Sequence, residues 1–238
     1  MKTTQETGSK DKGTVKPERR LLVIGILFIA AFIITAALVF SSVIQSVDSG
    51  LAQALNNSPP DGAFSALMIL VSDFGQYRFW IPVVLIMLLL GDRNTKLLAF
   101  ELAALLLIST VSGDIAKMIF YRQRPYETLT SISLLVPRET DSSFPSGHAL
   151  IVAIGATFSV TKFKNRILGL ALILEAALVS YSRVYVGVHY PLDVIAGAFL
   201  GISTVGFGMF ILEKYFGPTL GRIVSATVKV LREGRLKL

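Results

Sequence analysis

The amino-acid sequence predicts an all-α, multi-pass membrane protein, built as a bundle of six transmembrane helices with short interfacial helices. Hydrophobic residues make up 53% of the 238-residue chain, and the mean hydropathy of +0.64 lies well above that of soluble domains. Long apolar runs recur along the chain, and Lys and Arg residues gather at the ends of these runs. A lipid bilayer is therefore the natural solvent for most of the sequence.

Composition also excludes several kinds of chemistry and partner. The chain contains no cysteine, so a disulfide, a thiolate-bound metal and a cysteine nucleophile are all ruled out. The net charge is +7, but the basic residues cluster at the ends of apolar runs instead of along one soluble face. We therefore attribute this charge to membrane orientation and expect no nucleic-acid partner.

The chain begins with a polar segment that precedes the first apolar run. Residues 1–20 are polar and charged without apolar periodicity, so we expect a disordered cytoplasmic tail there. The apolar run at 21–44 is too long for the hydrophobic core of a signal peptide, and no convincing cleavage site follows it. This run is therefore predicted to be a retained transmembrane helix.

Five further runs complete the predicted bundle of residues 21–213. A helix needs about 20 apolar residues to cross a hydrocarbon core of ~30 Å. Shorter apolar runs can also cross when they pack inside a bundle and their terminal Lys and Arg side chains reach the interface. The longer runs lie at 97–119 and 190–212, and the shorter ones at 77–91, 147–161 and 167–182.

One apolar segment is predicted not to cross the membrane. Residues 63–73 are too few to span the hydrocarbon core, and Gly75 interrupts the pattern immediately afterwards. We therefore expect this segment to lie at the membrane interface. The assignment matters, because a crossing at this point would invert the orientation of every later helix.

The distribution of basic residues predicts the orientation of the bundle. Loops on the cytoplasmic side are enriched in Lys and Arg. With six helices and an inside N-terminus, all but six of the 23 basic residues lie on the cytoplasmic side. We therefore expect both termini in the cytoplasm and the protein in the plasma membrane. The six exceptions, on the outer side, are Arg78, Lys117, Arg122, Arg124, Arg138 and Arg183.

The last segment, residues 214–238, combines one apolar helical face with several basic residues. This pattern is typical of an amphipathic helix that lies on anionic lipid. A solvated basic tail that only fixes the orientation of the protein is an equally good interpretation. We therefore expect a basic amphipathic C-terminal tail and leave its contact with lipid open.

The chain has only two histidines, His148 and His189, and both fall at the predicted outer ends of helices. Histidine acts as a nucleophile or as a general acid and base near neutral pH. A two-step phosphoryl transfer needs one group in each role. The two histidines and their neighbours are therefore the first candidates for an active site.

The first histidine follows Pro145, Ser146 and Gly147 at the start of an apolar helix. Free backbone N–H groups and the helix dipole make such a terminus an anion-binding site, and Ser146 adds a hydroxyl donor. Taken alone, the same four residues are equally compatible with simple helix capping.

The second histidine belongs to a cluster that runs from Ser182 and Arg183 to Asp193. His189 and Asp193 are four residues apart, about one helical turn, so the carboxylate can accept a hydrogen bond from one ring nitrogen. The other nitrogen would then be free to attack. Pro191 is tolerated in the first turn of a helix and places His189 at the mouth of that helix.

The third cluster contains Lys117, Arg124 and Pro125. Together with Arg183, the two cations offer three positive groups to the oxygens of a phosphoryl transition state. Interfacial snorkelling is the simpler explanation for any single basic residue, and we assign Arg122 and Arg138 to it.

Acidic residues inside apolar helices are costly and are often functional. Asp114 lies one turn before Lys117 and is hypothesised to orient that lysine. For Glu101 and Glu175 we favour protonated side chains that hydrogen-bond between helices.

In combination, the three clusters resemble the complete signature of the type 2 phosphatidic acid phosphatase superfamily. The match consists of Lys117 with six residues to Arg124-Pro125, then Pro145-Ser146-Gly147-His148, then Ser182-Arg183 with five residues to His189 and three more to Asp193. Order and spacing both agree, and three motifs together are far more specific than one. The resemblance covers roughly residues 21–213.

This resemblance implies a six-helix membrane fold and a phosphohistidine mechanism that uses neither a metal nor another cofactor. It implies that His189 attacks phosphorus, that Asp193 orients His189, and that His148 protonates the leaving oxygen and later activates water. It also implies that the phosphoryl oxygens are bound by Lys117, Arg124, Ser146, Gly147 and Arg183.

We therefore expect a phosphatase that acts on a lipid phosphate or diphosphate at the outer membrane face, with membrane lipids as its surroundings. A polyprenyl diphosphate such as undecaprenyl diphosphate is the favoured substrate, and phosphatidic acid or phosphatidylglycerophosphate is the alternative. Transfer of the phosphoryl group to another lipid or sugar is a second enzyme class. A non-catalytic membrane scaffold or transporter is a third possibility, which the intact motifs disfavour.

Overall fold

A computed structural model describes residues 17–56 and 62–216 together with the single positions 219, 222 and 225. The described part of the chain is helical and contains no strand, which confirms the all-α prediction. In chain order the elements are α1 (Pro17–Val39), α2 (Ser42–Asn56), α3 (Ala63–Phe74), α4 (Tyr77–Leu90), α5 (Arg93–Ile119), α6 (Pro125–Thr128), α7 (Gly147–Lys162), α8 (Arg166–Tyr185), α9 (Pro191–Ile211) and the π-helix η1 (Leu212–Phe216).

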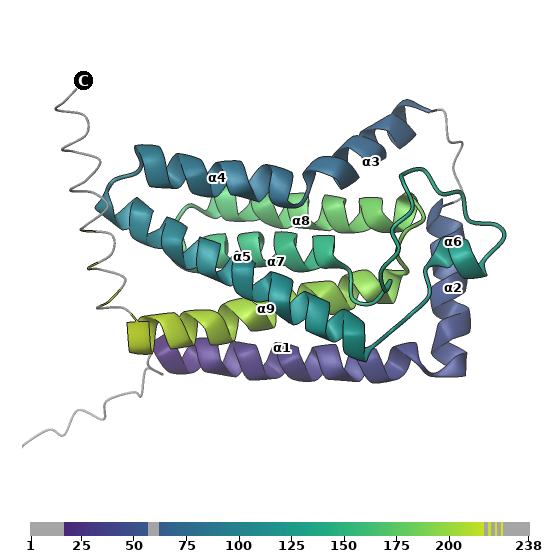
Figure 1. The fold of residues 1–238 in the computed structure, drawn as a ribbon, viewed down its shortest axis with the longest axis horizontal. Coiled ribbons are helices and arrows are strands. Elements are labelled where there is room, and N and C mark those ends of the chain that lie inside the picture. Colours follow the sequence, from purple (N-terminus) through teal and green to yellow (C-terminus); the bar gives the residue numbers. More distant parts are fainter. Residues whose placement is uncertain (1–16, 57–61, 217–218, 220–221, 223–224, 226–238) are drawn as a thin grey trace, which may run out of the picture.

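The long helices lie alongside one another and form an elongated bundle (Figure 1). Helix α9 packs most extensively against α1 and α7, and α7 packs in turn against α8. The first residues of α1 and the η1 segment lie at one end of the bundle. Helix α2 and the connections α5–α7 and α8–α9 lie at the opposite end. We call this second end the loop end.

Several helices have the length and composition of membrane spans. In the described part of the chain, four apolar stretches are long enough to cross alone: Arg19–Val39, Arg93–Ile119, Arg166–Tyr185 and Pro191–Phe216. Helices α3 and α4 meet the same criterion as a pair bent by 51°, and α7 is apolar but shorter. The multi-pass membrane fold is thus confirmed, while the count of six spans remains a prediction.

The N-terminal boundaries differ from those expected. Helix α1 begins at Pro17, before the predicted start at residue 21, because proline is favoured in the first turn of a helix. It ends at Val39, so the predicted run 21–44 joined two separate elements. Residues 1–16 and most of 214–238 lie outside the described residues, so the predicted tails stay predictions.

Helix α2, which was not predicted, is amphipathic and lies across the loop end (Figure 1). Val43, Val47 and Leu51 are exposed on one face, spaced four residues apart. Asp48 and Asn56 are buried on the other. The predicted run 21–44 included only the first three residues of α2, and polar residues such as Gln45 and Asp48 left no apolar run to mark the rest of the helix. The polar face of α2 therefore meets the loops that carry the motifs.

Close packing of α7 against α9 brings the two histidine motifs together. A Cβ atom added to Gly197 would lie 2.3 Å from the carbonyl oxygen of Ser146, and one added to Gly201 would lie 2.4 Å from that of Leu150. No side chain fits at either position. Small residues allow this approach of two helix backbones, as in other membrane bundles. The N-termini of α7 and α9 therefore lie next to each other.

Glu101, which was expected to form a contact between helices, pairs with a basic residue of α7. Its carboxylate lies 2.8 Å from the ammonium group of Lys162, which also pairs with Glu213 at 2.8 Å. The end of α7 thus supplies a basic partner for Glu101. Glu175 differs, because its buried Oε2 atom has neither a hydrogen-bond partner nor an ion-pair partner among the described residues.

Candidate active site

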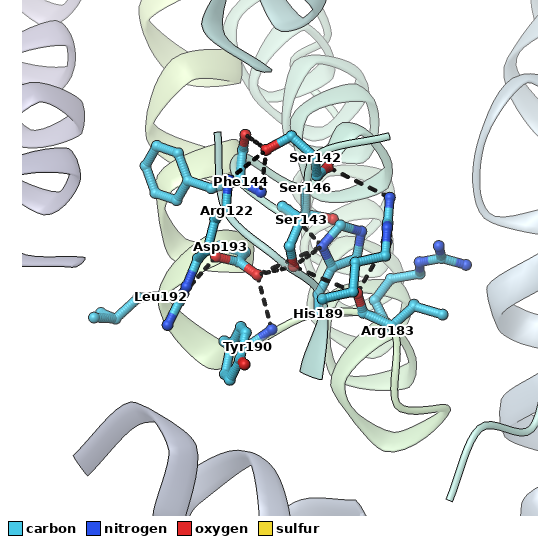
Figure 2. Close-up of polar contacts among 12 residues, drawn as sticks. Arg122, Ser142, Ser143, Phe144, Ser146, Arg183, His189, Tyr190, Leu192 and Asp193 are labelled. Carbon is cyan, nitrogen blue, oxygen red and sulfur yellow. Dashed lines mark hydrogen bonds and ion pairs between the residues drawn. The ribbon is translucent and has the colours of Figure 1, made fainter. Parts of the chain in front are cut away.

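The three sequence clusters meet at the loop end of the bundle. Arg124 donates to the carbonyl of Val188 at 2.9 Å, which joins the segment after α5 to the turn before α9. The backbone N–H of Ser146 donates to the carbonyl of Asp193 at 2.9 Å, which joins the start of α7 to α9. Segments far apart in sequence therefore build one polar site (Figure 2).

His189 lies in the turn between α8 and α9, and its ring is almost fully buried, at 1% exposure. Gly187 permits this turn with a φ of +85°, a conformation that other residues rarely adopt. Nδ1 of His189 lies 2.8 Å from the carbonyl oxygen of Ser143. Because a carbonyl only accepts, Nδ1 must carry the ring proton. Nε2 is then unprotonated and has a lone pair with which to attack.

Asp193 lies close to His189 but does not contact it directly. Its Oδ2 atom is 3.7 Å from Nδ1 of His189, which is longer than a hydrogen bond. Instead, Oδ2 accepts the hydroxyl of Ser143 at 2.5 Å and the backbone N–H of Tyr190 at 2.9 Å. The predicted hydrogen bond is therefore absent, and Ser143, which sequence reasoning missed, stands between the two residues (Figure 2).

Arg122 is a second residue that sequence reasoning missed. Its guanidinium donates to Asp193 at 2.6 Å and to Asp48 of α2 at 2.7 Å, and it lies 3.7 Å from the centre of the Tyr190 ring. Although burial opposes the charge, the two carboxylates raise the pKa of Arg122 above its ordinary value. The assignment of Arg122 to snorkelling was therefore wrong. The sequence did offer one signal of a functional role, because Arg122 lies on the outer side, where few basic residues are expected.

This geometry predicts that Arg122→Gln lowers kcat by about tenfold to hundredfold with little change in KM, because Arg122 holds Asp193 and not substrate. It should also destabilise the fold by about 3–5 kcal/mol, since two buried carboxylates lose their cation. Asp48→Asn is the matched variant, because it leaves the Arg122–Asp193 pair in place and should reduce kcat less. Steady-state kinetics and thermal unfolding check both. Equal kcat in Arg122→Gln and wild type would contradict the role.

The three predicted phosphate-binding cations are held by two acidic residues of the loop before α7. Arg124 is fully buried and contacts Asp141 at 2.5 Å and Glu139 at 2.7 Å. Arg183 also pairs with Glu139, and Lys117 pairs with Asp141. Although burial opposes ionisation, the neighbouring cations lower the pKa of both Glu139 and Asp141 to about 2. The structure thus brings all three cations together around ionised carboxylates.

The hypothesis that Asp114 orients Lys117 is contradicted by these contacts. Lys117 points to Asp141, across the loop, and Asp114 is exposed on α5. The sequence separation of 24 residues between Lys117 and Asp141 explains the error, because helical spacing identifies only local partners. No sequence signal marked Glu139 or Asp141 as members of the site.

The remaining predicted residues form the start of α7. Ser146 is the N-cap of this helix, and its hydroxyl accepts from the backbone N–H of Ala149 at 3.5 Å. His148 lines a cavity of about 880 Å³ together with Arg183. Within the part of the chain that the structure describes, the His148 ring makes no hydrogen bond. Its nitrogens are therefore available to a ligand in the cavity, next to the free N–H groups of the helix terminus.

The buried site lowers the proton affinity of His189. Burial, together with the charges of Arg124 and Arg183, lowers the pKa of this imidazole from 6.5 to about 4. The folded state therefore prefers the neutral ring, the form that can attack. The stability that the neutral His189 ring contributes to the fold is fully present above pH 6.5 and is lost as the pH falls toward 4.

This pKa can be measured directly, because the chain has only two histidines. In a His148→Gln variant, His189 is the single histidine, and NMR of labelled imidazole can follow it from pH 8 to pH 3.5. We expect a midpoint near 4 without ligand. A midpoint at or above 6.5 would show that the ring is not held neutral by its surroundings.

Among the described residues, no group of three or more His, Asp or Glu side chains is arranged to hold a metal ion. The donor set of the site is instead dominated by arginine, lysine and helix N–H groups. Such groups bind and stabilise phosphoryl oxygens. The arrangement fits a nucleophile, an acid or base, and an anion site at the same end of the bundle.

Comparison with known proteins gives consistent likenesses. The family model of the PAP2 superfamily matches residues 98–216, a segment that contains all three sequence clusters. An undecaprenyl-diphosphatase from Sulfolobus acidocaldarius is 45% identical over 139 residues, which cover 58% of this chain and 65% of that protein. A lipid A 4'-phosphatase from Bacteroides thetaiotaomicron is 31% identical over 66% of this chain and 73% of that protein.

The fold is also similar to a solved structure. The crystal structure of a transmembrane PAP2-type phosphatidylglycerolphosphate phosphatase from Bacillus subtilis matches with a TM-score of 0.68. The match has 23% identity and covers 80% of this chain and 96% of that one. At this identity the likeness shows the fold alone. Helices α2, α3 and α4 lie outside the segment that the family model matches.

Proposed function

Because this chain belongs to the PAP2 superfamily, we propose that it is a membrane lipid phosphatase that uses His189 as its nucleophile. The observation that carries the proposal is the hydrogen bond from Nδ1 of His189 to the carbonyl of Ser143, at 2.8 Å. This bond fixes the tautomer and leaves Nε2 free. The cations around it match the charge of a phosphoryl group in the transition state.

In the proposed mechanism, Nε2 of His189 attacks phosphorus and forms a phosphohistidine. The phosphorus–oxygen bond to the leaving group breaks, and His148 protonates the departing oxygen. His148 then removes a proton from the water that hydrolyses the phosphohistidine. Asp193 stabilises the charge that develops on His189, acting through the hydroxyl of Ser143, which donates to it at 2.5 Å.

The phosphoryl oxygens are bound in this proposal by Lys117, Arg124 and Arg183 together with the start of α7, where Ser146 and Gly147 lie. Arg124 and Arg183 already converge on Glu139, and a phosphoryl group offers the same kind of acceptor oxygens. No metal ion takes part in any step. The chemistry therefore rests on positioning and on fixed positive charge.

A polyprenyl diphosphate such as undecaprenyl diphosphate is the substrate that we favour. The archaeal relative with 45% identity bears that activity in its name, although the match covers 65% of its length. Phosphatidic acid or phosphatidylglycerophosphate is the alternative, supported by the likeness to a phosphatidylglycerophosphatase B from Bacillus subtilis, which is 29% identical over 80% of this chain and 93% of that protein. We place the reaction at the outer face of the plasma membrane. The site lies at the end of the bundle opposite to the start of α1 (Figure 1), and we expect the start of α1 on the cytoplasmic side.

A substrate panel tests this function. Purified protein in nanodiscs, with EDTA present, would be given farnesyl diphosphate, farnesyl monophosphate, phosphatidic acid and phosphatidylglycerophosphate, and free phosphate would be measured. We expect kcat/KM for the diphosphate to exceed that for the glycerolipids at least about tenfold. Phosphate release from none of them would refute the proposal, and loss of activity in EDTA would refute its metal-free chemistry. A phosphorylated acceptor lipid in place of free phosphate would indicate a phosphotransferase.

A further inference from the structure

The bend between α3 and α4 forms one wall of the active site, although it lies outside the segment that the family model matches. The two helices meet at 51° around Gly75 and Gln76. A Cβ atom added to Gly75 would lie 2.3 Å from Val179 of α8. The bend is therefore pressed against the helix that carries Arg183.

Two side chains of this bend reach the phosphate-binding residues. Ser72 is fully buried and accepts a hydrogen bond from Arg183 at 2.7 Å. Gln76 lies beside the start of α7, because a Cβ atom added to Gly147 would be 3.8 Å from its Nε2 atom. The bend thus contacts both the arginine and the helix N-terminus that are proposed to bind the phosphoryl group.

The same bend lines the cavity that contains His148. The cavity has a volume of about 880 Å³, within the range of small-molecule sites. Beyond His148 and Arg183, its polar lining consists of Ser72, Asp73, Gln76, Tyr77, Arg78, Arg138 and Glu139. Apolar side chains of α3 and of residues 135–136 complete it. A ligand in this space would meet further cations after passing His148.

We propose that this cavity holds the second phosphate of a diphosphate lipid, bound by Arg78 and Gln76 with Arg138 nearby. The proposal rests on the proposed function. When His189 attacks the terminal phosphorus, the bridging P–O bond breaks, and its electron pair leaves with the lipid monophosphate, which His148 protonates. An in-line displacement puts this leaving phosphate on the far side from His189. The cavity is lined by His148, the proposed acid for this phosphate, and not by His189.

Arg78 is the residue most available to bind this phosphate, because a ligand can displace its present partner. It pairs with Asp73, and the two side chains are 61% and 51% exposed. Exposed pairs of this kind contribute little to stability. The inner phosphate of the diphosphate would replace the carboxylate as an anionic acceptor, and its negative charge would grow as the bridging P–O bond breaks. When a lipid monophosphate reacts, its only phosphoryl group goes to His189 and the lipid leaves as an alcohol, which has no charged group for Arg78 to bind. Arg78 therefore distinguishes the two substrate classes.

The test compares Arg78→Gln with wild type on farnesyl diphosphate and farnesyl monophosphate. We expect kcat/KM for the diphosphate to fall about tenfold to hundredfold, as for a lost charged hydrogen bond. For the monophosphate we expect less than a threefold change, which also shows that the variant is folded. Arg78→Lys should retain part of the diphosphate activity. Arg93→Gln, which removes an exposed arginine at the opposite end of the bundle, should leave both substrates unaffected.

The Asp73→Asn variant distinguishes phosphate binding by Arg78 from a structural role of the Asp73–Arg78 ion pair. If Arg78 binds phosphate, removing its competing carboxylate should leave diphosphate turnover unchanged or raise it. An equal loss in Asp73→Asn and Arg78→Gln would mean that the ion pair itself matters, and it would overturn the subsite. Equal loss on both substrates in Arg78→Gln would overturn it too. Absence of phosphate release by wild-type protein from either substrate would instead refute the proposed function.

Discussion

Replacing His189 with alanine is expected to reduce phosphate release at least about ten-thousandfold, because the variant lacks the imidazole nitrogen that forms the covalent intermediate. The neighbouring Ser143 hydroxyl is committed to Asp193 at 2.5 Å. His189→Asn should be equally inactive, since an amide keeps the polarity of the ring without its nucleophilic lone pair. Phosphate release under saturating substrate measures the loss.

A matched control keeps this result specific to chemistry. Thr161→Ala changes an exposed hydroxyl at the far end of α7 and should retain wild-type turnover. Thermal unfolding of all three variants would show whether the bundle is intact. Retention of more than about one per cent of activity in His189→Ala would contradict covalent catalysis at this residue.

Replacing His148 with alanine should reduce turnover of a lipid diphosphate about hundredfold to ten-thousandfold, the contribution of a positioned acid and base. The two halves of its role can be separated with an aryl phosphate whose nitrophenolate group leaves without protonation. We expect His148→Ala to release a burst of about one nitrophenolate per enzyme, followed by slow turnover, because water is no longer activated.

The kinetic step that is slowed in His148→Ala shows which role His148 has. A rapid burst shows that the first step proceeds without His148, while slow turnover shows that the second step depends on it. If His148→Ala loses the burst and the steady state equally on both substrates, the residue binds phosphate or shapes the cavity and does not transfer protons.

The sequence predicted the helices and the motif residues well, because apolar runs and motif spacing are local properties. It failed where the prediction assumed regular geometry between neighbours. His189 and Asp193 were expected to share a helical turn, yet α9 begins only at Pro191. His189 therefore lies in the preceding turn, and its Nδ1 atom faces the carbonyl of Ser143. Spacing of four residues implies contact only when both residues are helical.

The contacts that span the chain could not be predicted from one sequence. Arg122 joins Asp48 to Asp193 across separations of 74 and 71 residues, and Asp48 lies on a helix that the hydropathy pattern did not predict. Glu139 and Asp141 belong to an irregular loop with no periodicity. Arg122 was assigned to snorkelling because each basic residue was considered singly. The two carboxylates that pair with its buried guanidinium come from distant segments.

The central claim is that phosphate passes through His189, and trapping the intermediate tests it most directly. His148→Ala protein would be mixed with the same aryl phosphate labelled in its phosphoryl group, quenched in base and digested, and the labelled peptide identified by mass spectrometry. The account predicts close to one phosphoryl group per protein on His189, and none in the double variant that also carries His189→Ala. Label on another residue, or hydrolysis with no labelled protein at any time, would contradict it.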